Sequence, residues 1–164
     1  MTATPDQQTE PNASAARNNR VIFLAIAVLA VAGIVVSAVS LQRHYAKSKT
    51  AFCDLGEKFD CDIVNRSEQS RVMGIPVAAI GIVGYGALLA LATVYRAGAE
   101  TPLRLLLAAI AGLAFALYLT YVEAYVLDTW CLLCLSSLAL IATITLLAGV
   151  AQVRARATRV EYTG

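Results

Sequence analysis

Four long runs with few or no charged residues constrain this 164-residue chain more than any other feature. Each run is close to or above the roughly 20 residues that an α-helix needs to cross a bilayer. The chain is 59% hydrophobic and 15% charged, whereas a soluble domain is roughly 45–50% apolar and about 25% charged. This composition excludes disorder. The sequence predicts an all-α integral membrane protein, a four-transmembrane-helix bundle with spans at about 21–41, 74–95, 103–127 and 131–153.

The two ends of the chain are polar, and we expect them to lie outside the membrane domain at residues 20–153. Residues 1–19 lack apolar periodicity, which predicts a disordered tail, and residues 154–164 form a short basic tail. A secretory signal is the alternative for the first run, because Arg17 and Arg20 precede it. Its apolar stretch exceeds the roughly 7–15 residues of a signal core, so we expect an uncleaved helix.

The order of the spans fixes which connections share a face of the membrane. With four spans, the long connection at residues 42–73 and the short turn at 128–130 lie on one face, and both termini lie on the other. Lys and Arg are split seven to six between the terminal and the loop face. The seven lie close to span ends, whereas the six are spread among five acidic residues. The positive-inside rule therefore favours cytoplasmic termini and an extracytoplasmic loop between the first two helices.

All four cysteines fall on the predicted extracytoplasmic face. Cys53 and Cys61 lie in the long connection with seven residues between them, and Cys131 and Cys134 form a Cys-Leu-Leu-Cys motif where the fourth span begins. An oxidising compartment lets disulfides form and persist. Two cysteine pairs on this face predict dithiol chemistry.

The Cys131/Cys134 pair has the spacing of a redox-active dithiol. Residues i and i+3 share a helix face with Cβ atoms roughly 5–6 Å apart, and a modest adjustment brings them into the range of a disulfide. Backbone N–H groups of the first helical turn stabilise a thiolate, the form that reacts. A static disulfide is the alternative, but so short a loop restricts the unfolded chain little.

The Cys53/Cys61 pair is open to more than one interpretation. It lies in a polar segment that another protein can approach, which suits an electron shuttle, and its spacing also suits a structural loop disulfide. A zinc ion bound by all four thiolates is a further alternative. A redox-inert membrane scaffold with two structural disulfides is the alternative of a different functional class.

The order of these features resembles the vitamin K epoxide reductase family in its bacterial form, over about residues 21–153. Proteins of the DsbB type do similar chemistry, but their C-x-x-C precedes the widely spaced pair. The resemblance implies a four-helix membrane bundle around a quinone. It rests on Cys53 and Cys61, Ser67, Gly74-Ile75-Pro76 with Gly81 and Tyr85, Tyr121-Val122-Glu123, and Cys131-Leu-Leu-Cys134.

The resemblance also implies roles for individual residues. Cys134 faces the quinone, Cys131 is its disulfide partner, Cys53 and Cys61 are the shuttle, and Ser67 helps to position the loop at the quinone. Separately, Glu123 is a candidate cofactor-binding residue, because an acid inside a span is a functional candidate by default; a hydrated side chain near the surface is the alternative.

The implied activity is that of a thiol:quinone oxidoreductase in the bacterial inner membrane. It would reoxidise a thioredoxin-fold, DsbA-like protein and reduce menaquinone or ubiquinone, which supports disulfide formation in exported proteins. This sequence departs from the family pattern in two ways, which refine the expected activity. The chain ends soon after the fourth span, so we expect a separate partner in place of a fused thioredoxin-like domain. Leu138 stands where vertebrate enzymes have a Tyr, which favours plain quinone reduction over epoxide reduction.

Overall fold

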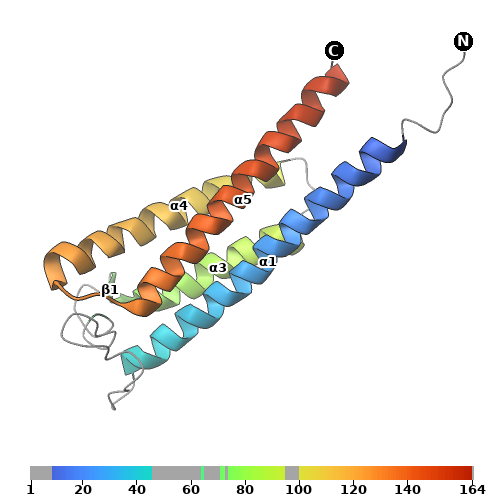
Figure 1. The fold of residues 1–164 in the computed structure, drawn as a ribbon. Helices are drawn as coiled ribbons and strands as arrows, with labels where there is room; N and C mark the ends of the chain where they lie inside the picture. The colour runs from blue at the N-terminus through green and yellow to red at the C-terminus, as the bar shows by residue number, and fades with distance from the viewer. Residues whose placement is uncertain (1–8, 46–63, 65–70, 73, 95–99, 164) are drawn as a thin grey trace, which may run out of the picture.

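Each of the four predicted apolar runs forms a helix in the computed structural model, which describes residues 9–45, 64, 71–72, 74–94 and 100–163 (Figure 1). The last helix begins after a short non-helical turn that follows η3. The helices are α1 (Thr9–Tyr45), α3 (Val77–Thr93), α4 (Thr101–Val122), which continues as the π-helix η3 (Glu123–Leu127), and α5 (Leu132–Thr163). A short antiparallel hairpin of β1 (Arg71–Val72) and β2 (Ile75–Pro76) precedes α3.

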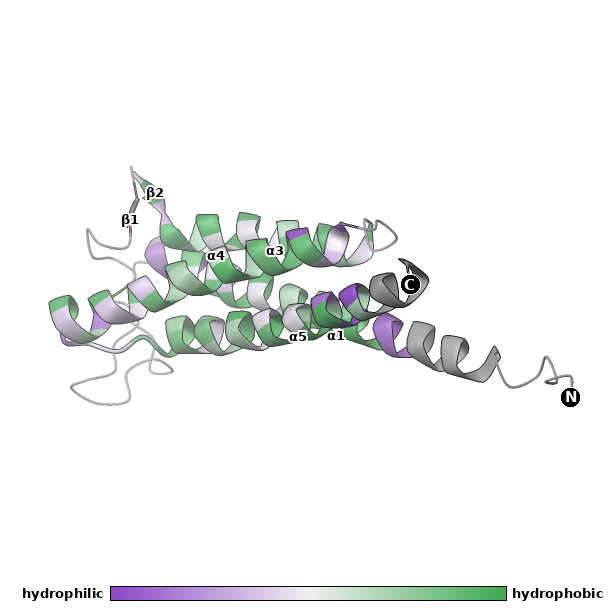
Figure 2. Cartoon of the chain, turned by 90° about the horizontal axis from the view of Figure 1, so that it is seen from above, coloured by the Kyte–Doolittle hydropathy of each residue, from purple (hydrophilic) through white to green (hydrophobic). Residues whose placement is uncertain are grey.

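The helices pack as a ring in which each one contacts two others closely. Helix α1 packs against α3 and α5, and α4 packs against α5 and α3. Helix α1 begins and α5 ends at the same end of the bundle (Figures 1 and 2). This arrangement agrees with the predicted parity, in which the two ends of the chain share one face.

Three helical segments are long and apolar enough to cross a membrane: Asn18–Tyr45, Thr101–Leu127 and Leu132–Ala157. Helix α3 is apolar but has 17 residues, which extend over about 26 Å against a hydrocarbon core of about 30 Å. Most of the helical ribbon is coloured as hydrophobic (Figure 2), and many large apolar side chains are exposed, among them Val83 and Leu146, each 72% exposed. Such a surface suits lipid and not water. The crossing by α3 stays a prediction.

The structure differs from the predicted boundaries at both ends and before α3. Helix α1 begins at Thr9, so residues 9–19 are helical where we expected a disordered tail. This stretch holds several alanines, the best helix formers, and it continues the span without a break. Helix α5 likewise runs through residues 154–163 of the predicted basic tail. The second helix starts three residues late, because Gly74 adopts a φ of 84° that an α-helix excludes.

The interior of the bundle is divided into a packed half and a hollow half. The packed half lies toward the start of α1 and the end of α5, where Ile26, Leu105 and Ile144 are fully buried. Ala30, Ala109 and Ala148 are buried among them, and their small side chains let the helices approach closely. The hollow half lies at the opposite end, beside the Cys-Leu-Leu-Cys motif.

Candidate active site

At the end of α4 the chain reverses its direction, so that the following residues lie beside the last turn of this helix. From Glu123 to Leu127 the helix widens into η3, a form that is frequent at functional sites. Asp128 then takes a left-handed conformation with φ 46°, which a short polar residue tolerates and which ends the helix. The N–H of Thr129 donates to the carbonyl oxygen of Glu123 at 3.3 Å. The chain therefore reverses within a few residues and α5 starts beside Glu123.

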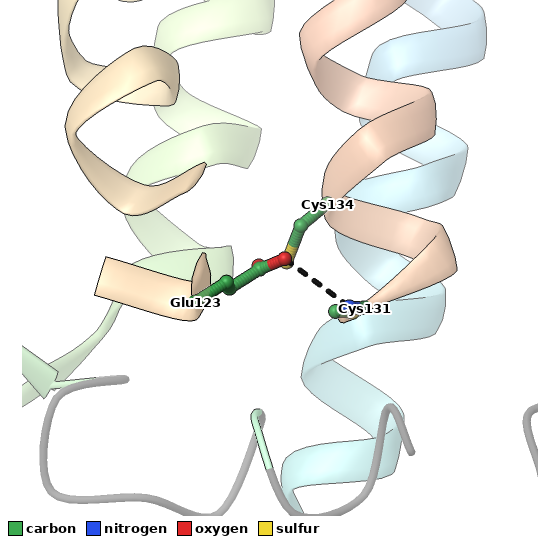
Figure 3. Close-up of side chains that lie close together, drawn as sticks. All are labelled: Glu123, Cys131 and Cys134. Atoms are coloured by element: carbon green, nitrogen blue, oxygen red, sulfur yellow. Dashed lines mark hydrogen bonds between the residues drawn. The ribbon is translucent and has the colours of Figure 1, made fainter. Parts of the chain in front are cut away.

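Glu123 binds the start of α5 through a backbone hydrogen bond. The N–H of Cys131 donates to Glu123 Oε2 at 3.1 Å (Figure 3). Cys131 caps α5, since its carbonyl oxygen accepts the first helical hydrogen bond, from the N–H of Leu135 at 3.0 Å. A carboxylate at a helix N-terminus is stabilised by the helix dipole. The carboxylate is buried, with Glu123 only 2% exposed.

The two thiols and the carboxylate form one compact cluster. The sulfur atoms of Cys131 and Cys134 and a carboxylate oxygen of Glu123 all lie within 4.8 Å of one another (Figure 3). The Cys134 thiol lies beside the carboxylate and interacts with it. No disulfide joins Cys131 to Cys134, and a bond of about 2.05 Å between them needs only a local adjustment of the helix start. The geometry therefore allows the pair to open and close in place.

A residue of the long connection covers this cluster. Val64 is buried and packs with Cys131, which is itself fully buried, and with the neighbouring Leu127, Leu133 and Cys134. Val64, which belongs to the connection between α1 and β1, thus lies over the start of α5. This contact covers the Cys131 sulfur, while Cys134 is only partly buried and lines the cavity.

An apolar cavity of about 400 Å³ fills the hollow half of the bundle and reaches the cluster. Cys134 and Glu123 line it, together with apolar side chains from α1, α3, α4 and α5. A volume of roughly 300–1,000 Å³, mostly apolar walls and a few polar groups are typical of small-molecule sites. Apart from the cluster, the polar side chains in the lining are Ser37, Ser40, His44, Tyr85 and Ser137.

Tyr85 closes the cavity on the side of the packed half. Its hydroxyl donates to the carbonyl oxygen of Ser137 at 2.9 Å and lies 2.9 Å from the Ser137 hydroxyl. Its ring lies on Gly33 of α1, where an added Cβ would overlap the ring atoms. Tyr85 therefore connects α3, α1 and α5 where the cavity meets the core.

Small residues line the cavity on α3 and α4. Gly84 and Ala87 of α3 and Ala111 of α4 belong to this lining and have exposed surface. The cavity therefore extends between these two helices.

The structure brings together three of the six predicted site residues. Cys131, Cys134 and Glu123 form the cluster, whereas Cys53, Cys61 and Ser67 lie outside the described residues, so the shuttle and the four-thiolate zinc alternative are not tested. Sequence reasoning gave no role to the Tyr85–Ser137 pair. A tyrosine within an apolar run was the available signal, because a buried hydroxyl needs a partner.

Fold and site together define a class: a helical membrane protein with a dithiol and a buried carboxylate at one end of an apolar cavity. Residues 24–149 match the model of the Vitamin K epoxide reductase family. The match covers more than half of the chain, and the protein belongs to this family. Members of the family are membrane-embedded oxidoreductases that link thiols to quinones in general.

Proposed function

We propose that this protein is a thiol:quinone oxidoreductase that accepts electrons from a separate thioredoxin-fold, DsbA-like protein. Reoxidation of that partner would support disulfide formation in exported proteins. The observation that carries the proposal is the position of Cys134, whose sulfur is within 4.8 Å of Cys131 and which also lines the cavity. One thiol can thus belong to the dithiol and contact a bound acceptor.

The cavity suits a quinone. A quinone has a flat apolar ring, two carbonyl oxygens and usually an isoprenoid tail, and the lining offers apolar walls with few polar groups. Ile80, Phe115 and Leu119 would hold the ring, and the part of the cavity beside Gly84 and Ala111 would hold the start of the tail. When bound, the quinone supplies an acceptor of two electrons and two protons.

The dithiol has distinct environments for its two sulfurs, which supports a division of labour. Cys134 is partly exposed to the cavity and carries the reacting thiolate, since the N-terminal turn of α5 stabilises negative charge. Cys131 is fully buried and lies close enough to close the disulfide with Cys134. In the proposed relay, Cys131 is the sulfur attacked from the long connection, whose Val64 packs on it.

The position of Val64 supports a shuttle by the long connection. Cys61 lies three residues before Val64 in the sequence, and three residues extend over at most about 11 Å. Val64 packs on Cys131, and in the proposed relay Cys61 would act within this reach of Val64. In the proposed relay, the partner reduces the Cys53/Cys61 disulfide, and the resulting thiols reduce the Cys131/Cys134 disulfide by exchange. Ser67, three residues after Val64, would help to position this segment at the quinone.

The proposed location is the bacterial inner membrane, with the cysteines on the extracytoplasmic face and both termini in the cytoplasm. This face is oxidising, so the disulfides of the relay persist between cycles. The orientation is supported by the distribution of Lys and Arg, and the shared end of α1 and α5 fits it (Figure 1).

A direct test mixes the purified protein with a reduced thioredoxin-fold protein and a water-soluble quinone analogue. We expect quinone consumption that depends on both the partner and the membrane protein. Cys134→Ser and Cys131→Ser should each abolish it, whereas Ser136→Ala, beside the motif and exposed, is the matched control and should retain it. No consumption by the wild type, with both disulfides retained under reducing partner, would favour the redox-inert scaffold. An epoxide supplied in place of the quinone should remain unreduced.

A further inference from the structure

The buried carboxylate of Glu123 uses only one of its two oxygens in its contact with the start of α5. Oε2 accepts the Cys131 N–H at 3.1 Å, while Oε1 has no hydrogen-bond partner among the described residues and is shielded from solvent. A buried polar atom without a hydrogen bond costs free energy of folding. Such an atom in a native structure calls for an explanation, and a catalytic role is one. Because the Cys134 thiol touches the same carboxylate, the unpaired oxygen lies beside the reacting sulfur.

We propose that Glu123 is a catalytic proton acceptor for the Cys134 thiol. This inference rests on the proposed function and adds the residue that handles one of its two protons. The carboxylate takes the proton as the Cys134 sulfur becomes nucleophilic, and then holds it at the edge of the cavity. The carboxylate can take the proton from Cys134 and pass it to a molecule in the cavity without a large movement, because Glu123 contacts Cys134 and also lines the cavity.

The proton and electron count of the step balances. As the S–S bond forms between Cys131 and Cys134, two S–H bonds break, and two electrons and two protons leave the thiols. The Cys134 proton passes to the Glu123 carboxylate and from there to the bound quinone, while the Cys131 proton goes to water. Water supplies the second proton of the hydroquinone, and Glu123 is again ionised at the end of the cycle.

Other described groups are less suited to this role. Titratable side chains that line the cavity besides Glu123 and Cys134 are His44 and Tyr85. The Tyr85 hydroxyl is bound to Ser137, and His44 contacts Arg71 at 3.4 Å at an exposed position. Asp128 belongs to the turn that follows η3 and is absent from the cavity lining. Among the described carboxylates, Glu123 is therefore the one in contact with the reacting thiol.

The decisive variant is Glu123→Gln, which keeps an oxygen for the Cys131 N–H but cannot take up a proton. In reduced, quinone-free protein, the rate of Cys134 alkylation at neutral pH should be retained, because the side-chain oxygen of Gln still accepts the Cys131 N–H and keeps the motif in place. Quinone turnover should fall by about 10²–10⁴-fold, the usual contribution of general acid–base catalysis. Glu100→Gln, an exposed acid paired with Arg104 at 2.6 Å, is the control and should change neither rate.

Loss of turnover with retained alkylation identifies a proton acceptor, whereas a structural capping role predicts that both fall together. Parallel loss in Glu123→Gln, or turnover within twofold of the wild type, would overturn the proposal. Time-resolved infrared spectra of the wild type during a single turnover provide a second measurement that needs no folded variant. A transient carboxylic-acid C=O band, absent from the resting dithiol and disulfide states and shifted in D₂O, is expected, and its absence would also overturn the proposal. A wild type that reduces no quinone would instead overturn the proposed function.

Discussion

The N–H of Cys131 donates to the side chain of Glu123, a residue eight positions earlier on another helix, at 3.1 Å. This bond joins the end of α4 to the start of α5 and places a carboxylate beside both thiols of the motif. The position of the dithiol thus depends on the way α4 ends. The same hydrogen bond holds α4 and α5 together and keeps the carboxylate next to the thiols.

Gly84 offers a way to fill the cavity without disturbing the helices. A Cβ at Gly84 would have no neighbouring atom within 4 Å among the described residues, and Gly84 lines the cavity. Gly84→Leu should therefore fold but occupy the space of the quinone. We expect kcat/KM for the quinone to fall by roughly tenfold or more, since overpacking costs about 1–3 kcal/mol.

The matched control for this variant is Gly86→Leu. A Cβ at Gly86 also has nothing within 4 Å, but Gly86 does not line the cavity. Steady-state kinetics with a quinone analogue should separate the two variants. Equal kinetics in both would show that the quinone binds elsewhere.

Gly33 tests the contact that closes the cavity. A Cβ at this position would overlap the Tyr85 ring, and the ring is held on its other side by the bonds of its hydroxyl to Ser137. Gly33→Ala should lower the free energy of unfolding by about 1–3 kcal/mol, the usual cost of overpacking. Thermal unfolding in detergent measures this loss.

Gly149→Ala is the control for Gly33→Ala, because an added Cβ at Gly149 has no atom within 4 Å. Alanine is the better helix former by about 1 kcal/mol, so this variant should be neutral or more stable. Tyr85→Ala combined with Gly33→Ala should cost less than the sum of the two single changes. Additive losses would contradict direct overlap between the two positions.

The relay predicts that Cys134→Ala traps an intermediate. Cys131 then has no resolving thiol on α5, so a mixed disulfide between Cys131 and either Cys53 or Cys61 should accumulate. Non-reducing peptide mapping of membranes that contain quinone detects the crossed link. A local Cys53–Cys61 disulfide alone, with Cys131 alkylated, would mean that the long connection does not exchange with the dithiol.

The orientation is checked with reporter fusions. Alkaline phosphatase, which folds only where disulfides form, should be active when fused within residues 47–57 and inactive when fused after Arg154. Reversed activities would place the cysteines in a reducing compartment, where the proposed relay could not hold its disulfides. Activity at both sites would contradict the predicted four membrane crossings, because three of them separate the two fusion sites.

The sequence predicted the four apolar helices well because burial in lipid imposes a simple length and composition on each of them. It predicted the helix ends poorly. The start of α1 at Thr9 and the end of α5 at Thr163 reflect local helix propensity, which continues past the apolar stretch. The positive φ of Gly74 moved the start of α3 to Val77, a turn effect that hydropathy does not contain.

The sequence indicates which residues are candidates for the site, but it does not indicate how they are arranged in space. Cys131, Cys134 and Glu123 were singled out from motif spacing and from the cost of an acid in a span. Their meeting was not predictable, because an interval of eight residues would separate Glu123 from Cys131 along a continuous helix by about 12 Å. The widened turn of η3 and the left-handed Asp128 bring them together. Both features depend on tertiary packing, which periodicity does not describe.

The division of the bundle into a packed and a hollow half affects how the reaction relates to the membrane potential. The packed core and the Tyr85 contact lie beyond the cavity, so the thiols, Glu123 and the cavity all lie toward one end of the bundle. In the proposed reaction, protons are released and taken up on the same side, and no charge crosses the core. Turnover would then be electrically silent: it would neither build the membrane potential nor be slowed by it. The energy available to disulfide formation would come from the difference in reduction potential alone.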